Sequence, residues 1–136
     1  MENYPSKVDK EKLIFSILKF SDINEKRVDI CPDHEYLQVS GRIMNKGFFA
    51  PPHKHLKINR NTDTTQESWI ILEGKVKASF YDIDSSYLCN RVIEKGDVVV
   101  FYRGGHSLEV LEDNTVFYEF KNGPYYGVDI DKEKIL

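Results

Sequence analysis

The 136-residue sequence has few cysteines, no excess of basic residues and no long apolar run. Cys31 and Cys89 stand apart and form no Cys-x-x-Cys pair, so we expect two free thiols rather than a disulfide. The net charge of −3, with no stripe of lysine or arginine among aromatics, argues against nucleic acid as a partner. The first 20 residues lack the apolar stretch of a signal peptide, and no apolar run is long enough to cross a membrane. We therefore expect a cytoplasmic protein with no membrane partner.

Long amphipathic helical patterns are also missing, and apolar residues recur mainly at every second position. The length suits a single domain, residues 1–136, with one core. Short β-branched and aromatic runs between turn residues predict strands at 13–20, 35–44, 68–74, 75–83, 87–93, 97–102, 106–111 and 115–121. This number and spacing of strands predicts an all-β sandwich, barrel or jelly roll. The tail, "VDIDKEKIL", is expected to form a final helical turn or to fold back along the barrel.

Four residues are candidates for a metal site. If residues 51–56 form a strand, alternation places His53 and His55 on the same face. Glu67 and His106 each open a later strand, and a closed barrel could turn both toward the same interior. Three imidazoles and a carboxylate suit a divalent transition metal and leave positions open for water or substrate. The alternative is a purely structural β-domain in which these four side chains have ordinary surface or core roles.

Glycines frame these candidates in a recognisable order. Gly47 precedes His53 by six positions, and Gly74 follows Glu67 by seven. Gly96 then precedes a strand that ends in Gly-Gly-His, so the pattern covers about residues 47–114. The arrangement resembles the two motifs of the cupin family, and in particular its small stand-alone metalloproteins, some of which come from polysaccharide gene clusters. The resemblance implies a single cupin-type jelly-roll barrel (double-stranded β-helix) with an added N-terminal strand.

The resemblance also implies that His53, His55, Glu67 and His106 bind a divalent metal such as Zn, Mn, Fe or Ni. The spacing departs from the family pattern, because eleven residues separate His55 from Glu67 where three or four are usual. We expect this insertion, residues 56–66, to lie over the mouth of the barrel. Tyr102 stands where the family has a proline.

Alternation along the strands predicts the residues around the metal. Trp69 and Ile71 share the inward side of Glu67, and Leu108 shares that of His106, which gives a largely apolar pocket. Trp69 either stacks on a sugar ring or fills the barrel. Arg60 and Tyr102 complete the predicted pocket, with Arg60 placed to meet a carboxylate or phosphate.

The strand at 115–121 has two possible orientations. If Glu119 and Lys121 face inward, they offer a catalytic base and a partner for an anion. Otherwise Tyr118 and Phe120 face inward as core residues and the charged pair is solvated.

These features predict a metal-binding cupin that acts on a small polar or sugar-like compound by Lewis-acid chemistry, as an isomerase, epimerase or lyase. One alternative is a cupin that binds a small molecule or sugar without catalysis, and a second is an iron-dependent dioxygenase. We also expect a homodimer, because the run "LIFSILKF" is apolar on both faces.

Overall fold

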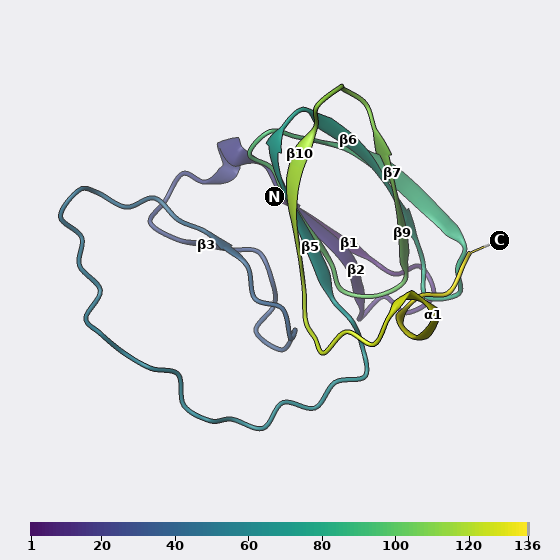
Figure 1. The fold of residues 1–136 in the computed structure, drawn as a ribbon, viewed down its shortest axis with the longest axis horizontal. Coiled ribbons are helices and arrows are strands. Elements are labelled where there is room, and N and C mark those ends of the chain that lie inside the picture. The colour runs from purple at the N-terminus through teal and green to yellow at the C-terminus, as the bar shows by residue number, and fades with distance from the viewer. Residues whose placement is uncertain (136) are drawn as a thin grey trace.

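The computed structural model describes residues 1–135, which form an all-β structure of antiparallel sheets (Figure 1). Over this range the strands are β1 (Glu2–Pro5), β2 (Leu13–Leu18), β3 (Val28–Asp29), β4 (Ser40–Gly41), β5 (Glu67–Glu73), β6 (Lys75–Tyr81), β7 (Tyr87–Glu94), β8 (Val98–Phe101), β9 (Gly105–Val110) and β10 (Val116–Lys121). The helical elements are a 3₁₀ turn at Phe20–Asp22 and α1 (Val128–Asp131). The structure also shows that, within residues 1–135, no helix is both long and apolar enough to span a membrane.

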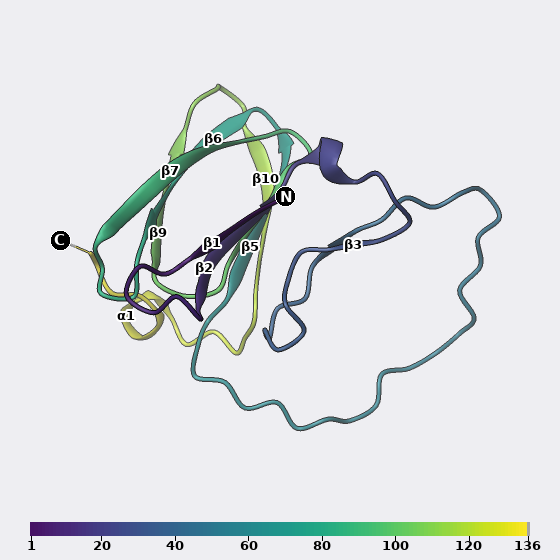
Figure 2. The same ribbon diagram turned by 180° about the vertical axis from the view of Figure 1, so that it is seen from behind.

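Two sheets enclose the main core, as Figures 1 and 2 show from opposite sides. The first sheet has the strand order β1-β2-β8-β5-β10, and the second has the order β7-β6-β9. β3 pairs with β4 in a separate short ribbon. β9 and β10 belong to different sheets, and the turn at 111–115 connects them.

The core forms because side chains alternate along the strands. On β6, Val76, Ala78 and Phe80 are fully buried while the residues between them are partly exposed. The ring of Phe80 stacks on that of Phe15 from β2, with 3.6 Å between centroids. Burial of these apolar surfaces between the two sheets is the main source of stability.

β8 is buried on both faces, which explains its continuous apolar sequence. Val99 and Phe101 face the core between the sheets. Val98 and Val100 face a second cluster on the outer side, where they pack with Ile30 and other residues of the segment before β4. Cys31 is buried in this outer cluster and Cys89 is half-buried on β7, and both are free thiols as the sequence predicts.

Most of the predicted strands are confirmed. The strand at 13–20 and the six strands predicted between 68 and 121 appear with ends shifted by one or two residues. The tail forms the helical turn α1, which is one of the two alternatives. β1 was not predicted, because it is short and ends in Pro5, and it is held by antiparallel pairing with β2.

One predicted strand is mostly absent, and the condition of a strand at 51–56 is not met. Residues 35–44 form a strand only at Ser40–Gly41, because Leu37 and Val39 pack against the outer face of the first sheet and the Leu37 amide donates to a side chain, Gln66 Oε1, at 2.7 Å. Residues 51–56 form no strand within the described chain. They belong to residues 42–66, here called the 42–66 segment, which is largely exposed and leaves the two-sheet structure, here called the barrel, as a long loop in Figures 1 and 2.

Packing within one chain explains why the run "LIFSILKF" is apolar on both faces. Most of it forms β2, which lies between β1 and β8 and is buried on both faces. Its apolar character therefore does not require a second subunit, and the homodimer stays a prediction without this support.

Candidate functional site

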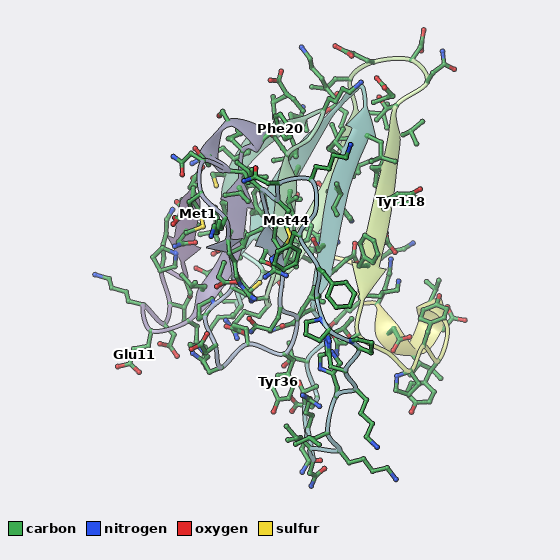
Figure 3. The ribbon with its side chains drawn as sticks, turned by 90° about the vertical axis from the view of Figure 1, so that its left-hand side faces the viewer. Met1, Glu11, Phe20, Tyr36, Met44 and Tyr118 are labelled. Carbon is green, nitrogen blue, oxygen red and sulfur yellow. The ribbon has the colours of Figure 1, made fainter. Side chains whose placement is uncertain are left out.

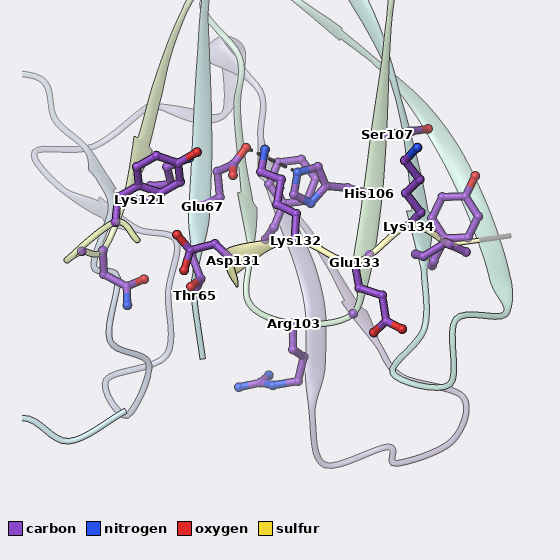
Figure 4. A pocket seen from close by; sticks show the side chains of 18 of the residues that line it. Thr65, Glu67, Arg103, His106, Ser107, Lys121, Asp131, Lys132, Glu133 and Lys134 are labelled. Carbon is purple, nitrogen blue, oxygen red and sulfur yellow. Dashed lines mark ion pairs between the residues drawn. The ribbon is translucent and has the colours of Figure 1, made fainter. Parts of the chain in front are cut away.

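One end of the barrel contains a cavity of about 610 Å³ (Figure 4). It lies where β5 and β9 begin and where β8 and β10 end, and the residues at 131–135 close part of it. The lining includes Glu67, Arg103, His106, Lys121 and Tyr125. Acidic, basic and aromatic side chains from separate strands and loops therefore converge on a single pocket.

Glu67 and His106 form the centre of this site. His106 Nε2 lies 3.4 Å from Glu67 Oε1, and the pair is marked by a dashed line in Figure 4. The side chain of Glu67 is 8% exposed and that of His106 is 28% exposed. The carboxylate is thus buried behind an imidazole that solvent and a ligand can reach.

Aromatic neighbours fix the orientation of both side chains. Glu67 and Trp69 share a face of β5, and Trp69 Nε1 donates to Glu67 Oε1 at 2.6 Å. The imidazole of His106 stacks on Phe101, with 4.1 Å between centroids, and meets the edge of Trp69 at 5.3 Å. Trp69 is 3% exposed, so it fills the barrel and holds the carboxylate.

The surroundings favour the ionised form of Glu67. Burial by itself would raise the pKa of this carboxyl, but the hydrogen bond and charge of His106, together with the indole N–H, outweigh burial and lower the pKa below its ordinary value of 4.5. Glu67 is therefore an anion at neutral pH, and it can stabilise a protonated imidazole beside it.

The register between β10 and β5 selects one of the two orientations considered for residues 115–121. Lys121 lies opposite Glu67, and Glu119 lies opposite Trp69, so both charged side chains share the inward face. Tyr118 and Phe120 face outward and are exposed. Lys121 Nζ pairs with Glu119 at 3.2 Å and lies 5.0 Å from the centre of the Tyr125 ring, and the hydrogen bond from Lys121 to Glu119 raises the pKa of Lys121. The cavity wall thus presents a cation beside an aromatic face.

A buried polar network supports the same end of the barrel. Glu35 is 5% exposed and accepts hydrogen bonds from Arg103 Nη2 at 2.8 and 3.0 Å. Gln66 Nε2 donates to the same carboxylate, and Arg103 Nη1 donates to the carbonyl of Leu13. The network joins the chain before the 42–66 segment to Gln66, the last residue of that segment, and to Arg103 after β8. Nothing in the sequence pattern indicates it, because Glu35 only opens a predicted strand, Gln66 lies in a polar stretch, and both residue types are usually exposed.

His53 and His55 lie elsewhere, on the exposed 42–66 segment. Their rings are 5.8 Å apart, and His53 Nδ1 lies 2.9 Å from the carbonyl oxygen of Pro51. Among residues 1–135, no group of three or more His, Cys, Asp or Glu side chains is placed to hold a metal ion. The structure therefore brings together two of the four predicted ligands, and in this arrangement the four do not fit a metal centre.

The remaining predicted pocket residues take different positions. Ile71 is fully buried in the core between the sheets, and Leu108 faces inward beside Ala78 but is 37% exposed. Arg60 lies on the 42–66 segment and outside the cavity. Tyr102 is fully buried in the outer cluster, where its hydroxyl lies 3.1 Å from Ser16 Oγ. It cannot line the pocket, because its neighbour Phe101 takes the inward face of the strand.

No family model, curated protein or solved structure matches this chain. The geometry of the cavity is therefore the basis of the functional proposal.

Proposed function

We propose that this protein is a cupin-type barrel that binds a small polar or sugar-like compound in the cavity and transfers a proton with the Glu67–His106 pair. The reaction would be of the isomerase, epimerase or lyase type. The observation that carries the proposal is the accessible imidazole of His106, which lies 3.4 Å from a buried carboxylate that an indole N–H holds in place.

The roles of the two side chains follow from their contacts. With Nε2 facing Glu67, the other ring nitrogen, Nδ1, is the one that exchanges a proton with a ligand. The Glu67 carboxylate fixes this tautomer and stabilises the charge when His106 becomes protonated. A proton taken from one position of the ligand can be returned at another, so the imidazole ends each cycle unchanged.

Lys121 and Tyr125 would hold the ligand. The ammonium group can pair with a carboxylate or phosphate, and the Tyr125 ring offers a flat surface for a sugar or another ring. Cavity volume and lining are typical of a site for a small molecule with a few polar groups.

As a second proposal, the same cavity binds a divalent metal ion, one of Zn, Mn, Fe or Ni. Glu67 and His106 already offer an oxygen and a nitrogen donor side by side, and His53 and His55 are close enough to each other to bind one ion. The two histidines would have to reach the cavity from the 42–66 segment. Metal analysis of protein purified without added metal, repeated for His53→Ala and His106→Ala, tests this, and unchanged metal content in both variants excludes the site.

The proton-transfer proposal is tested in D₂O with sugar nucleotides and small keto acids. NMR should show deuterium entering one of these compounds with wild-type protein, and a rate at least about 100-fold lower with His106→Asn. Glu67→Gln should also slow the exchange, while His34→Asn, which changes an exposed histidine outside the cavity, should not. Binding without exchange for every compound would contradict catalysis and indicate a binding protein.

A further inference from the structure

The two strands that flank the open side of the barrel have one unused edge each. In residues 1–135, β10 pairs only with β5, and β9 pairs only with β6. Figure 1 shows β10 and β9 on opposite sides of the barrel, with the 111–115 turn between them. Open edges of this kind present rows of backbone donors and acceptors that bind extended chain.

The hydrogen-bond pattern identifies which amides face these edges. The Asn122 amide bonds to the Gln66 carbonyl, and alternation along β10 then directs the amides of Glu119 and Lys121 away from β5. On β9, the Leu111 amide bonds to the Lys75 carbonyl. The same alternation directs the amides of His106, Leu108 and Val110 away from β6.

Apolar side chains next to these edges are incompletely covered. Leu108 and Val110 face the interior opposite Ala78 and Val76, which are fully buried, yet they are 37% and 51% exposed. On the outer face of β10, Tyr118 is 58% exposed and projects outward in Figure 3. A strand added at either edge would cover part of this surface.

The 42–66 segment has the composition and length to supply such strands. It exposes large apolar side chains, with Phe48 at 62%, Phe49 at 74%, Leu56 at 75% and Ile58 at 62%. Its 25 residues can extend over roughly 80 Å, enough to run along two six-residue strands of about 20 Å each. Its first end follows β4 of the short ribbon and its second end continues into β5, the partner of β10, so the segment is tethered to the sheet that carries one of the two edges.

We propose that the 42–66 segment closes onto the edges of β9 and β10, adds extended chain to both sheets and covers the side of the cavity. The segment is the favoured occupant because it continues directly into β5, the partner of β10, is long enough to reach β9 as well, and exposes large apolar residues. Closure would gate access to the cavity. This inference goes beyond the proposed function and does not depend on proton transfer or on metal binding.

Residue-resolved hydrogen exchange on the whole protein tests closure. In the closed form, the edge-facing amides of Glu119, Lys121, Leu108 and Val110 should exchange at least tenfold more slowly than they do as unpaired amides. The amides of Tyr118 and Phe120, which face β5, provide the internal standard for protected positions. Edge-facing amides that exchange as fast as unstructured chain would overturn the proposal.

Substitutions in the segment provide the second measurement. Neighbouring residues of an extended chain point to opposite faces, so closure buries at least one of Phe48 and Phe49. The double variant Phe48→Ser/Phe49→Ser should therefore increase exchange at the edge-facing amides at least tenfold, with Tyr118 and Phe120 still protected. Tyr126→Ser, which removes a 65% exposed aromatic side chain elsewhere, should leave exchange unchanged. Edge protection that rises with protein concentration, or that survives the double substitution, would contradict closure by the segment of the same chain.

Discussion

Glu67 is the residue on which the site depends most. Its carboxylate is almost completely buried, and burial without partners would favour the neutral acid. The imidazole of His106 and the indole N–H of Trp69 instead favour the anion. The same contacts therefore affect both the chemistry of the site and the stability of the fold.

The first prediction concerns the pH dependence of stability. Because the pKa of Glu67 is lower in the folded protein, ionised Glu67 stabilises the fold above the unfolded pKa, and this contribution is lost as the pH falls from about 4.5 through the folded value. Urea denaturation should show that the difference in unfolding free energy between wild type and Glu67→Gln shrinks on acidification through this range. Glu73→Gln, at an exposed position of the same strand, should give a small difference throughout. A constant difference for Glu67→Gln at every pH would contradict the assignment.

Gly104 is the residue that allows the turn from β8 to β9. Its φ is +72°, and a Cβ atom there would collide with the carbonyl oxygen of Tyr81. The second prediction is that Gly104→Ala lowers the unfolding free energy by about 2 kcal/mol or more, because both the backbone conformation and the contact are unfavourable. Gly47→Ala is the matched control, since Gly47 has φ +91° but no atom within 4 Å of the position that a Cβ would occupy. Equal losses in urea denaturation would show that the contact with Tyr81 has no effect.

At the scale of elements, a buried polar contact at Glu35 helps to attach the chain before the 42–66 segment to the barrel. Glu35 accepts from Arg103, two residues after β8, and from Gln66, the residue before β5. Removal of the carboxylate would leave a guanidinium group, 22% exposed, and a buried amide without this partner.

The third prediction is that Glu35→Ala lowers the unfolding free energy by about 3 kcal/mol, as expected when one member of a buried ion pair is removed. Asp33→Ala, at an exposed position two residues earlier, should change it by less than about 0.5 kcal/mol. Chemical denaturation of both variants checks this. A loss for Glu35→Ala no larger than that for Asp33→Ala would show that the network contributes little.

The sequence predicts elements well where local pattern and packing agree. From β5 to β10, period-two alternation and glycine turns lead to the observed strands. Residues 35–39 also alternate, but there the side chains pack onto the outside of a sheet while a backbone amide bonds to the side chain of Gln66. Alternation alone cannot distinguish a strand from an extended segment that covers one.

Alternation along the strands also made part of the candidate site predictable. Strand parity places Glu67, Trp69 and His106 on inward faces, and the structure brings them together. To predict that Glu119 and Lys121 face inward, one must know the register between β5 and β10, and no local sequence pattern gives that register. The contributions of Glu35 and Gln66 depend on contacts between distant parts of the chain, so they could not be read from either stretch alone.

For the whole molecule, the open side of the barrel is the main feature. The 42–66 segment contributes no residue to the two clusters of buried apolar residues, so the barrel core does not depend on it. The segment does, however, end at β5, next to the open edge of β10, and the open edge of β9 lies across the cavity.

The fourth prediction is that replacing residues 43–60 with a short Gly/Ser linker leaves a folded barrel that self-associates. Light scattering should show a larger mass for this variant as protein concentration rises, because its β9 and β10 edges are left without the chain that would cover them. Tyr118→Lys in the shortened protein should reduce the association, since lysine on an edge strand opposes pairing. A shortened protein that stays monomeric at all concentrations would contradict this.

The central place of β8 also has a consequence for synthesis of the protein. β2 ends at residue 18, and its partner β8 ends at residue 101, so 83 residues must follow β2 before their pairing is complete. At typical rates of translation this takes roughly 4–17 s. During that time the first hairpin, β1 with β2, has an apolar surface and no sheet to join. The nascent chain therefore passes through a period of several seconds in which chaperones, rather than its own later strands, are the available partners for that surface.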